Sequence, residues 1–188
     1  QIGYTVTTIA PSEITAENLK PFDAVVVGIR AYNTVPELAF TQAVLNSYVE
    51  AGGTLVLQYN TSHALVTEDL APYALKLSRD RVTDEHSEVT LLEPKHPILN
   101  FPNKITQSDF DGWVQERGLY FPSEWSKEFT PILGMHDKDD PETKGSLLVA
   151  SFGKGHYIYT GLSFFRELPA GVPGAYRLFA NILSIGKE

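Results

Sequence analysis

Residues 23 to 59 contain the pattern that most restricts the fold. The run from Asp23 to Ile29 (DAVVVGI) is almost continuously apolar, which is typical of a strand buried on both faces of a parallel sheet. A second apolar run follows at Thr54 to Tyr59 (TLVLQY). Between the two runs, Asn33 and Pro36 predict the start of a helix, and Gly52-Gly53 predicts its end. A strand, a helix and a strand of these lengths predict a βαβ unit, and therefore an α/β domain.

The two ends of the chain add further regular elements. Tyr4 to Ile9 (YTVTTI) is rich in β-branched residues and predicts a strand. Ser146 to Phe152 and His156 to Gly161 predict paired strands around a glycine turn. From Gly174 to Ile185 the apolar residues recur at helical spacing, which predicts a final helix. We therefore expect a mostly parallel sheet flanked by helices, of the flavodoxin-like kind.

The stretch from 60 to 145 differs from the rest, because it holds most of the prolines and many charges. Short strands are expected at Ser87 to Leu92 and near Thr130 to Met135. We expect the remainder of this stretch to be an irregular lobe of one domain that covers residues 1–188. A length of 188 residues suits one domain.

Composition excludes several classes of function. The net charge is −8 without a run of Lys and Arg, so we expect no nucleic-acid partner. No apolar stretch approaches the roughly 20 residues that cross a bilayer, so no membrane span is expected. The absence of cysteine excludes disulfides, thiolate catalysis and zinc held by cysteine. The five histidines form neither an HxH nor an HExxH pattern, so we expect no metal site and no cofactor.

Several long stretches resemble one family. They are GIRAYNT at 28–34, GWVQERGLYFP at 112–122, GKGHYIYTGL at 153–162 and the closing segment at 161–187. They are similar to class I glutamine amidotransferase-like domains, including the ThuA-like group. The similarity is particularly strong to a domain found C-terminal to PIG-L (LmbE-like) deacetylase domains in bacterial proteins.

This resemblance implies several properties. The family usually has a strand and a helix before the first strand seen here, so we expect a fragment of a longer protein that lacks them. The expected partner is a zinc-dependent deacetylase domain for N-acetyl sugars in the same polypeptide. Many relatives carry export signals, so a periplasmic or secreted location is expected.

The turn after the Thr54 to Tyr59 run bears on catalysis. Class I amidotransferases place a nucleophilic Cys on this turn, whereas this chain has Tyr59-Asn60-Thr61. Neither Tyr nor Asn is a plausible acyl nucleophile without strong activation. Thr61 or Ser62 could act with the adjacent His63, but neighbouring residues rarely present the required geometry. We therefore predict no catalytic residue in this chain.

A ligand is expected beyond the carboxyl ends of the strands, as in other open α/β sheets. The candidate ligand-binding residues are Arg30, Tyr32, Asn33, Tyr59, Asn60, Arg117, Arg166 and Glu167. Arginine binds carboxylates and phosphates through two points, which suits an anionic or sugar-like ligand. The alternative is internal pairing of Arg117 or Arg166 with Glu116 or Glu167.

Aromatic residues also gather in the sequence, as Trp113, Tyr120, Phe121 and Trp125, then Phe164 and Phe165. They could stack on a sugar ring, form core, or cover a neighbouring domain.

Three hypotheses for function follow. The first is a non-catalytic accessory domain that helps a deacetylase bind its substrate or assemble. The second is a stand-alone hydrolase that uses Glu116 or Glu167 as general acid or base. The third is a carbohydrate-binding module, possible because the strand ends carry both polar and aromatic side chains.

Overall fold

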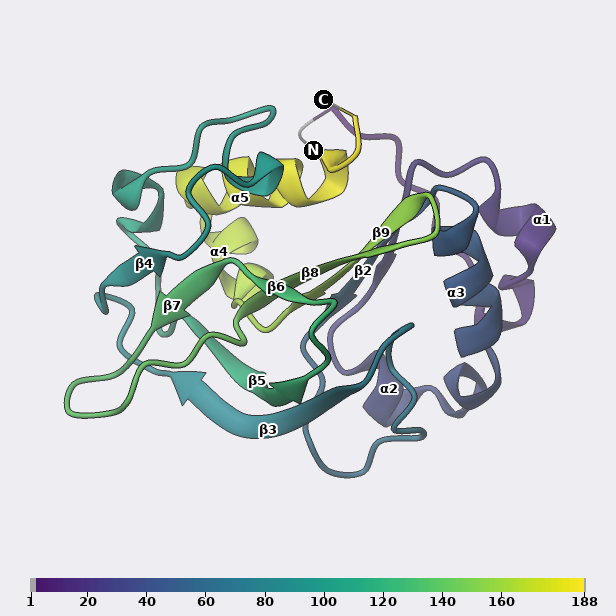
Figure 1. The fold of residues 1–188 in the computed structure, drawn as a ribbon, viewed down its shortest axis with the longest axis horizontal. Coiled ribbons are helices and arrows are strands. Elements are labelled where there is room, and N and C mark those ends of the chain that lie inside the picture. The colour runs from purple at the N-terminus through teal and green to yellow at the C-terminus, as the bar shows by residue number, and fades with distance from the viewer. Residues whose placement is uncertain (1–2, 188) are drawn as a thin grey trace.

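The structure is a computed structural model that describes residues 3–187. Its centre is a five-stranded sheet with the order β1-β2-β9-β8-β6 (Figure 1). The strands are β1 (Ala24–Val27), β2 (Thr54–Gln58), β9 (Gly155–Thr160), β8 (Leu147–Phe152) and β6 (Thr130–Pro131). Strands β1, β2 and β9 run parallel to one another. Strand β8 pairs antiparallel with β9 on one side and with β6 on the other. The expected α/β class, the βαβ unit and the late paired strands are confirmed.

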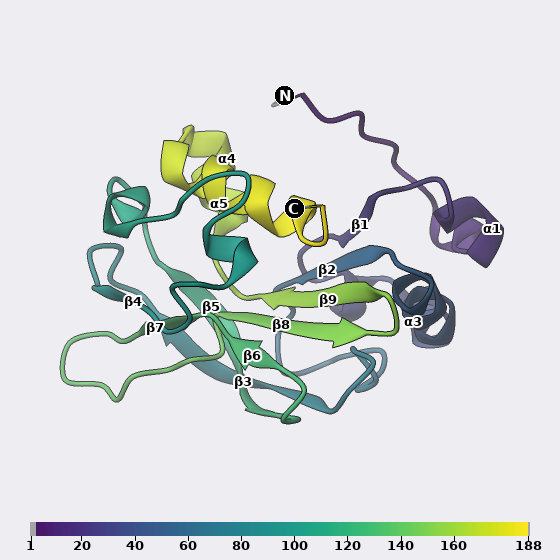
Figure 2. The same cartoon turned by 45° about the horizontal axis from the view of Figure 1, so that its top comes forward.

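Helices cover both faces of this sheet (Figure 2). They are α1 (Ala16–Leu19), α2 (Ala31–Thr34), α3 (Gln42–Glu50), α4 (Phe164–Ala170) and α5 (Pro173–Ser184). Short 3-10 helices occur at Pro11–Glu13, Pro36–Phe40, Pro97–Leu99 and Gln107–Phe110. The helix expected to begin at Asn33 to Pro36 and to end at Gly52-Gly53 is a 3-10 turn followed by α3, and α2 is a further short helix before it. Pro36 is the first residue of this 3-10 turn, where the missing backbone N–H of proline loses no intrahelical hydrogen bond.

Alternating side chains of the strands fill two cores. On one face, Val56 and Ile158 pack in a cluster with Leu178 and Ile182 of α5. On the other face, residues such as Leu55 and Tyr157 pack in a cluster with the helix α3. Because successive side chains of a strand point to opposite faces, β2 and β9 contribute to both cores.

Strand β1 lies at the edge of the sheet, which corrects an expectation. The Asp23 to Ile29 run was expected to be buried on both faces, but β1 pairs with β2 alone among the described strands, and Val26 is 40% exposed. The expected strand at Tyr4 to Ile9 is also wrong, because this segment forms no ladder and is mostly exposed. Residue type favours an extended backbone there, but a strand also needs a neighbour with which to pair.

The stretch from 60 to 145 is more regular than expected. An antiparallel ribbon joins β3 (Leu75–Val82) to β5 (Gly118–Trp125), and a shorter pair joins β4 (Val89–Leu91) to β7 (Leu133–Met135). The sequence pattern obscures the ribbon for two reasons. Its pairing shifts register at several positions, and Pro122 within β5 argues against a regular strand. Figure 1 shows β3 and β5 side by side below the central sheet in this view.

Candidate functional site at the carboxyl edge of the sheet

The carboxyl ends of the parallel strands bring three loops together at one edge of the sheet. Arg30 follows β1, Tyr59 follows β2, and Ser163 follows β9. The backbone N–H of Arg30 donates a hydrogen bond of 2.8 Å to the carbonyl of Tyr59, which ties the first two loops together. Arg30 itself has a left-handed backbone (φ 55°) where the chain turns into α2, and its side chain is exposed.

The turn after β2 is held by amide side chains. The side chain of Asn60 is fully buried, and its oxygen Oδ1 accepts a hydrogen bond of 2.9 Å from the backbone N–H of Tyr32. The side chain of Asn33 accepts from the N–H of Thr61 at 2.8 Å and donates to the carbonyl of His63 at 3.0 Å. The Tyr32 hydroxyl is also internal, because it donates to the side chain of Gln42. Tyr32, Asn33 and Asn60 therefore shape the turn from within.

The hydroxyl of Thr61 has a structural partner as well. It donates a hydrogen bond of 2.9 Å to the backbone carbonyl of His63. A serine or threonine nucleophile needs a general base that accepts its proton, and a carbonyl cannot serve as that base. The geometry of this turn therefore agrees with a binding or structural role for the edge.

An aromatic face lies beside the turn, formed by Tyr59, Tyr120 and Phe165. The rings of Tyr59 and Tyr120 are stacked with centroids 6.2 Å apart, and Phe165 lies 5.1 Å from Tyr59. Burial raises the pKa of the Tyr59 hydroxyl, although the nearby charge of Arg30 opposes this shift. At neutral pH the Tyr59 hydroxyl is thus uncharged.

Arg166 and Glu116 form an ion pair at the border of the aromatic face. Nε of Arg166 donates to Oε1 of Glu116 at 2.7 Å, and its guanidinium lies 4.9 Å from the ring centroid of Phe165. A second guanidinium nitrogen donates to the side chain of Gln115. The internal pairing considered for Arg166 is therefore present, and it orients the guanidinium over the aromatic ring.

Glu167 is fully buried in α4 behind this edge. Its carboxylate accepts hydrogen bonds from the backbone N–H of Val114 at 3.0 Å and from the hydroxyl of Ser163 at 3.3 Å. Burial raises the pKa of Glu167, while these two hydrogen bonds and the charge of Arg117 act in the opposite direction. The carboxylate thus joins the β9–α4 turn to the segment before β5.

Arg117 is directed into the lobe rather than toward a ligand. It is 5% exposed, and its guanidinium donates to the carbonyl of Ser87 at 2.7 and 3.1 Å and to the carbonyl of Phe110. The rings of Phe110 and Trp113 lie within 6 Å of its charge. Burial lowers the pKa of Arg117, which the negative charge of Glu167 opposes. Its three donors link two loops of the stretch from 60 to 145.

The structure thus divides the predicted site residues into two groups. Arg30, Tyr59 and Arg166 have side chains near one another at the carboxyl edge, as the charge effects on Tyr59 also indicate. The other five, Tyr32, Asn33, Asn60, Arg117 and Glu167, bond to the protein interior or to turns. Tyr120, Phe165 and Glu116 complete the edge. Tyr120 and Phe165 belong to the aromatic clusters of the sequence, which indicated that they could contact a ligand.

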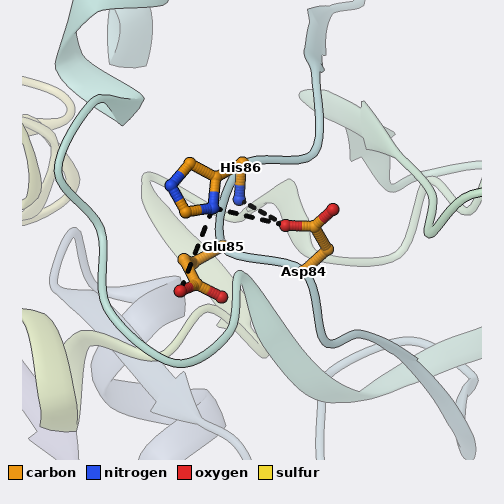
Figure 3. Close-up of side chains that lie close together, drawn as sticks. All are labelled: Asp84, Glu85 and His86. Carbon is orange, nitrogen blue, oxygen red and sulfur yellow. Dashed lines mark hydrogen bonds and ion pairs between the residues drawn. The ribbon is translucent and has the colours of Figure 1, made fainter.

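One group of side chains within residues 3–187 has the composition of a metal site. Figure 3 shows Asp84, Glu85 and His86, whose ligand atoms lie within 4.8 Å of one another. Nδ1 of His86 lies 3.5 Å from Asp84 and 3.9 Å from Glu85, and the ring is 83% exposed. Three successive residues on an exposed turn, with the ring turned toward their own carboxylates, give no independent indication of an ion.

Comparison with known proteins shows a likeness of fold. No protein-family model and no curated protein sequence matches the chain. Two solved structures, both cytoplasmic proteins from Salmonella typhimurium, are similar with TM-scores of 0.57 and 0.56 at 14% identity. Each match covers 90% of this chain and 74% of the other. A beta-galactosidase from Rahnella sp. R3 is similar at TM-score 0.51 and 13% identity, over 89% of this chain and 23% of the galactosidase.

These comparisons correct the expected location. The periplasmic or secreted location implied by the family resemblance is contradicted, because the two Salmonella neighbours are described as cytoplasmic proteins. The resemblance concerns the domain, whereas export depends on signals outside the quoted stretches. Separately, none of the helices within residues 3–187 has the length and apolar character needed to cross a membrane.

Proposed function

We propose that this chain is a non-catalytic accessory domain of a PIG-L-type deacetylase protein, where it aids binding of an N-acetyl sugar substrate or the packing of domains. The observation that carries the proposal is the turn after β2. There the Thr61 hydroxyl donates to the carbonyl of His63, and Asn60 is held by the backbone of Tyr32. Because the side chains of Thr61 and Asn60 are hydrogen-bonded within the turn, they are not available for acyl transfer.

The proposal includes a finer assignment of the fold. The βαβ unit, a third parallel strand and helices on both faces support a flavodoxin-like, class I amidotransferase-like domain of the ThuA-like kind. The galactosidase neighbour supports an accessory placement, because the matched region makes up 23% of a longer enzyme. This likeness is one of fold, and it leaves the ligand to be argued from the residues.

The stand-alone hydrolase is the second candidate, and the carboxylates argue against it. Glu116 is paired with Arg166 at 2.7 Å, and Glu167 is fully buried with its oxygens bonded to Val114 and Ser163. A general acid or base must reach the proton that it transfers. The aromatic face beside them is better suited to binding than to proton transfer.

Acetate release tests the proposal. The PIG-L domain expected in the same polypeptide is assayed on an N-acetylglucosamine conjugate, with and without residues 1–188. We expect the chain alone to release no acetate, and to raise the turnover or lower the KM of the deacetylase domain. Thr61→Ala and Ser62→Ala should leave this effect unchanged. Hydrolysis by the chain alone that disappears in Thr61→Ala or Glu167→Gln would refute the accessory role.

A further inference from the structure

Two hollows lie beside the β3–β5 ribbon, one toward residues 62–70 and the other toward residues 136–144. The first, of about 580 Å3, is lined by the apolar side chains of Leu75 and Leu77 and by Trp125. The second, of about 510 Å3, is lined by Arg79 and Arg81 and again by Trp125. Both volumes lie within the range of ligand sites. Trp125 lines both hollows, which together are named the ribbon groove.

Trp125 differs from the other tryptophan in its surroundings. Trp113 is buried, its N–H donates to the carbonyl of Asp109 at 3.0 Å, and its ring contacts two phenylalanines. Trp125 is half-buried, and within residues 3–187 its ring pairs with no other aromatic ring. Within the part of the chain that the structure describes, the indole N–H of Trp125 donates to no protein acceptor, and because it is not a buried atom it reaches solvent. An indole with an open N–H between two hollows is arranged to contact a ligand.

The polar rim of the ribbon groove carries both signs of charge. Lys76 and Glu124 form an ion pair of 2.7 Å at the first hollow. Glu142 and Lys144 form one of 3.6 Å at the second, where Arg79, Arg81 and Asp80 also contribute. Together the linings of the two hollows hold four basic and six acidic side chains, so negative charge is in slight surplus. This rim suits a neutral ligand with many hydroxyl groups better than an anion.

We propose that the ribbon groove binds a neutral oligosaccharide, with the apolar face of one sugar ring stacked on Trp125 and its hydroxyls bonded to the charged rim. Aromatic side chains supply apolar contact together with a polar handle, as a sugar ring requires. Strand β3 has 8 residues and thus extends roughly 27 Å at ~3.4 Å per residue, enough for several rings in a row. The inference goes beyond the accessory role, because the groove binds a glycan whether or not a deacetylase is attached.

Calorimetric titration of the full 188-residue chain tests this proposal. The probes are the hexamers of N-acetylglucosamine, glucose and mannose, with a heparin hexasaccharide as the anionic comparison. We expect at least one neutral hexamer to bind, and Trp125→Ala to weaken it tenfold or more. Trp125→Phe, which keeps a flat ring, should retain binding within about threefold of wild type if stacking dominates. Phe40→Ala, which removes an exposed aromatic ring that lines neither hollow, is the matched control and should bind like wild type.

Three results would refute oligosaccharide binding by the ribbon groove. They are equal binding by wild type and Trp125→Ala, no binding of any neutral hexamer at millimolar concentration, and binding of heparin alone. Loss of binding in Phe165→Ala but not in Trp125→Ala would place the sugar at the carboxyl edge, and the groove would again be wrong. Circular dichroism of each variant verifies its fold. Acetate release is independent of these titrations, so failure of the accessory role is distinguishable from failure of the groove.

Discussion

At the residue scale, Glu167 links burial to the pH dependence of stability. Burial raises its pKa in the folded protein above the value of roughly 4.3 for an unfolded chain. At a pH between the unfolded-state and folded-state pKa of Glu167, the folded protein retains a proton that the unfolded chain has lost. The free energy of unfolding therefore falls as pH rises through this window. Glu167→Gln removes this titration, and its amide oxygen can still accept from the N–H of Val114 while its NH2 donates to the hydroxyl oxygen of Ser163. We expect the variant to gain stability relative to wild type as pH rises above about 4, until the folded-state carboxyl has also lost its proton.

Urea unfolding at several pH values measures this difference. Glu167→Ala is the comparison, because it leaves the N–H of Val114 without its partner at 3.0 Å and should cost about 1–3 kcal/mol at neutral pH. A Gln variant whose stability difference from wild type did not change with pH would contradict the account.

Arg117 gives a second prediction at this scale. Its guanidinium satisfies the carbonyls of Ser87 and Phe110 in the interior. Arg117→Ala should destabilise the protein by about 2–5 kcal/mol, because both carbonyls lose a charged donor. This change corresponds to a melting temperature lower by roughly 5–15 °C. Arg117→Lys should recover less than half of the loss, since an ammonium lacks the planar fork. Calorimetry measures both variants, and a melting temperature near that of wild type for Arg117→Ala would refute the role.

At the element scale, the helix α5 depends on one close backbone approach. A Cβ on Gly174 would lie 1.8 Å from the carbonyl oxygen of Asp109, in the 3-10 helix Gln107–Phe110. An ion pair of 2.7 Å between Arg177 and Asp109 fixes the same contact. Alanine usually favours a helix over glycine, but here the backbone of one element must shift. Gly174→Ala should therefore cost more than about 2 kcal/mol.

Gly28 provides the matched control. A Cβ there would meet nothing within 4 Å, and its backbone angle is permitted for other residues. Gly28→Ala should change the free energy of unfolding by less than about 0.5 kcal/mol. Denaturant unfolding compares the two variants, and equal effects would show that α5 can move away from Asp109 without cost.

At the scale of the whole molecule, one sheet supports both cores. Ile158 packs toward α5, and Leu55 packs toward α3, on adjacent strands of the same sheet. Ile158→Ala and Leu55→Ala should each cost about 2–5 kcal/mol. Because β2 and β9 contribute to both cores, each variant should unfold in a single transition that is identical by far-UV circular dichroism and by tryptophan fluorescence. Separate transitions by the two probes would show that the two faces fold independently.

The sequence alone determined the elements whose signals are local. Apolar runs fixed β1 and β2, Gly52-Gly53 ended α3, and the spacing of Ala175, Leu178 and Ile182 fixed α5. The pairing of Arg166 with Glu116 was one of the alternatives, and the lack of a thiol was evident from composition. Local signals suffice here because turn residues and side-chain periodicity act within a few residues.

The tertiary structure decided everything that depends on distant neighbours. It placed β1 at an edge although its residues are typical of a central strand, and it left Tyr4 to Ile9 without a partner. It turned Arg117 inward and left Trp125 beside two hollows, although both lie in the same sequence stretch. Burial and pairing are set by segments far apart in the chain, so residue type alone cannot distinguish a side chain that stabilises the fold from one that faces a ligand.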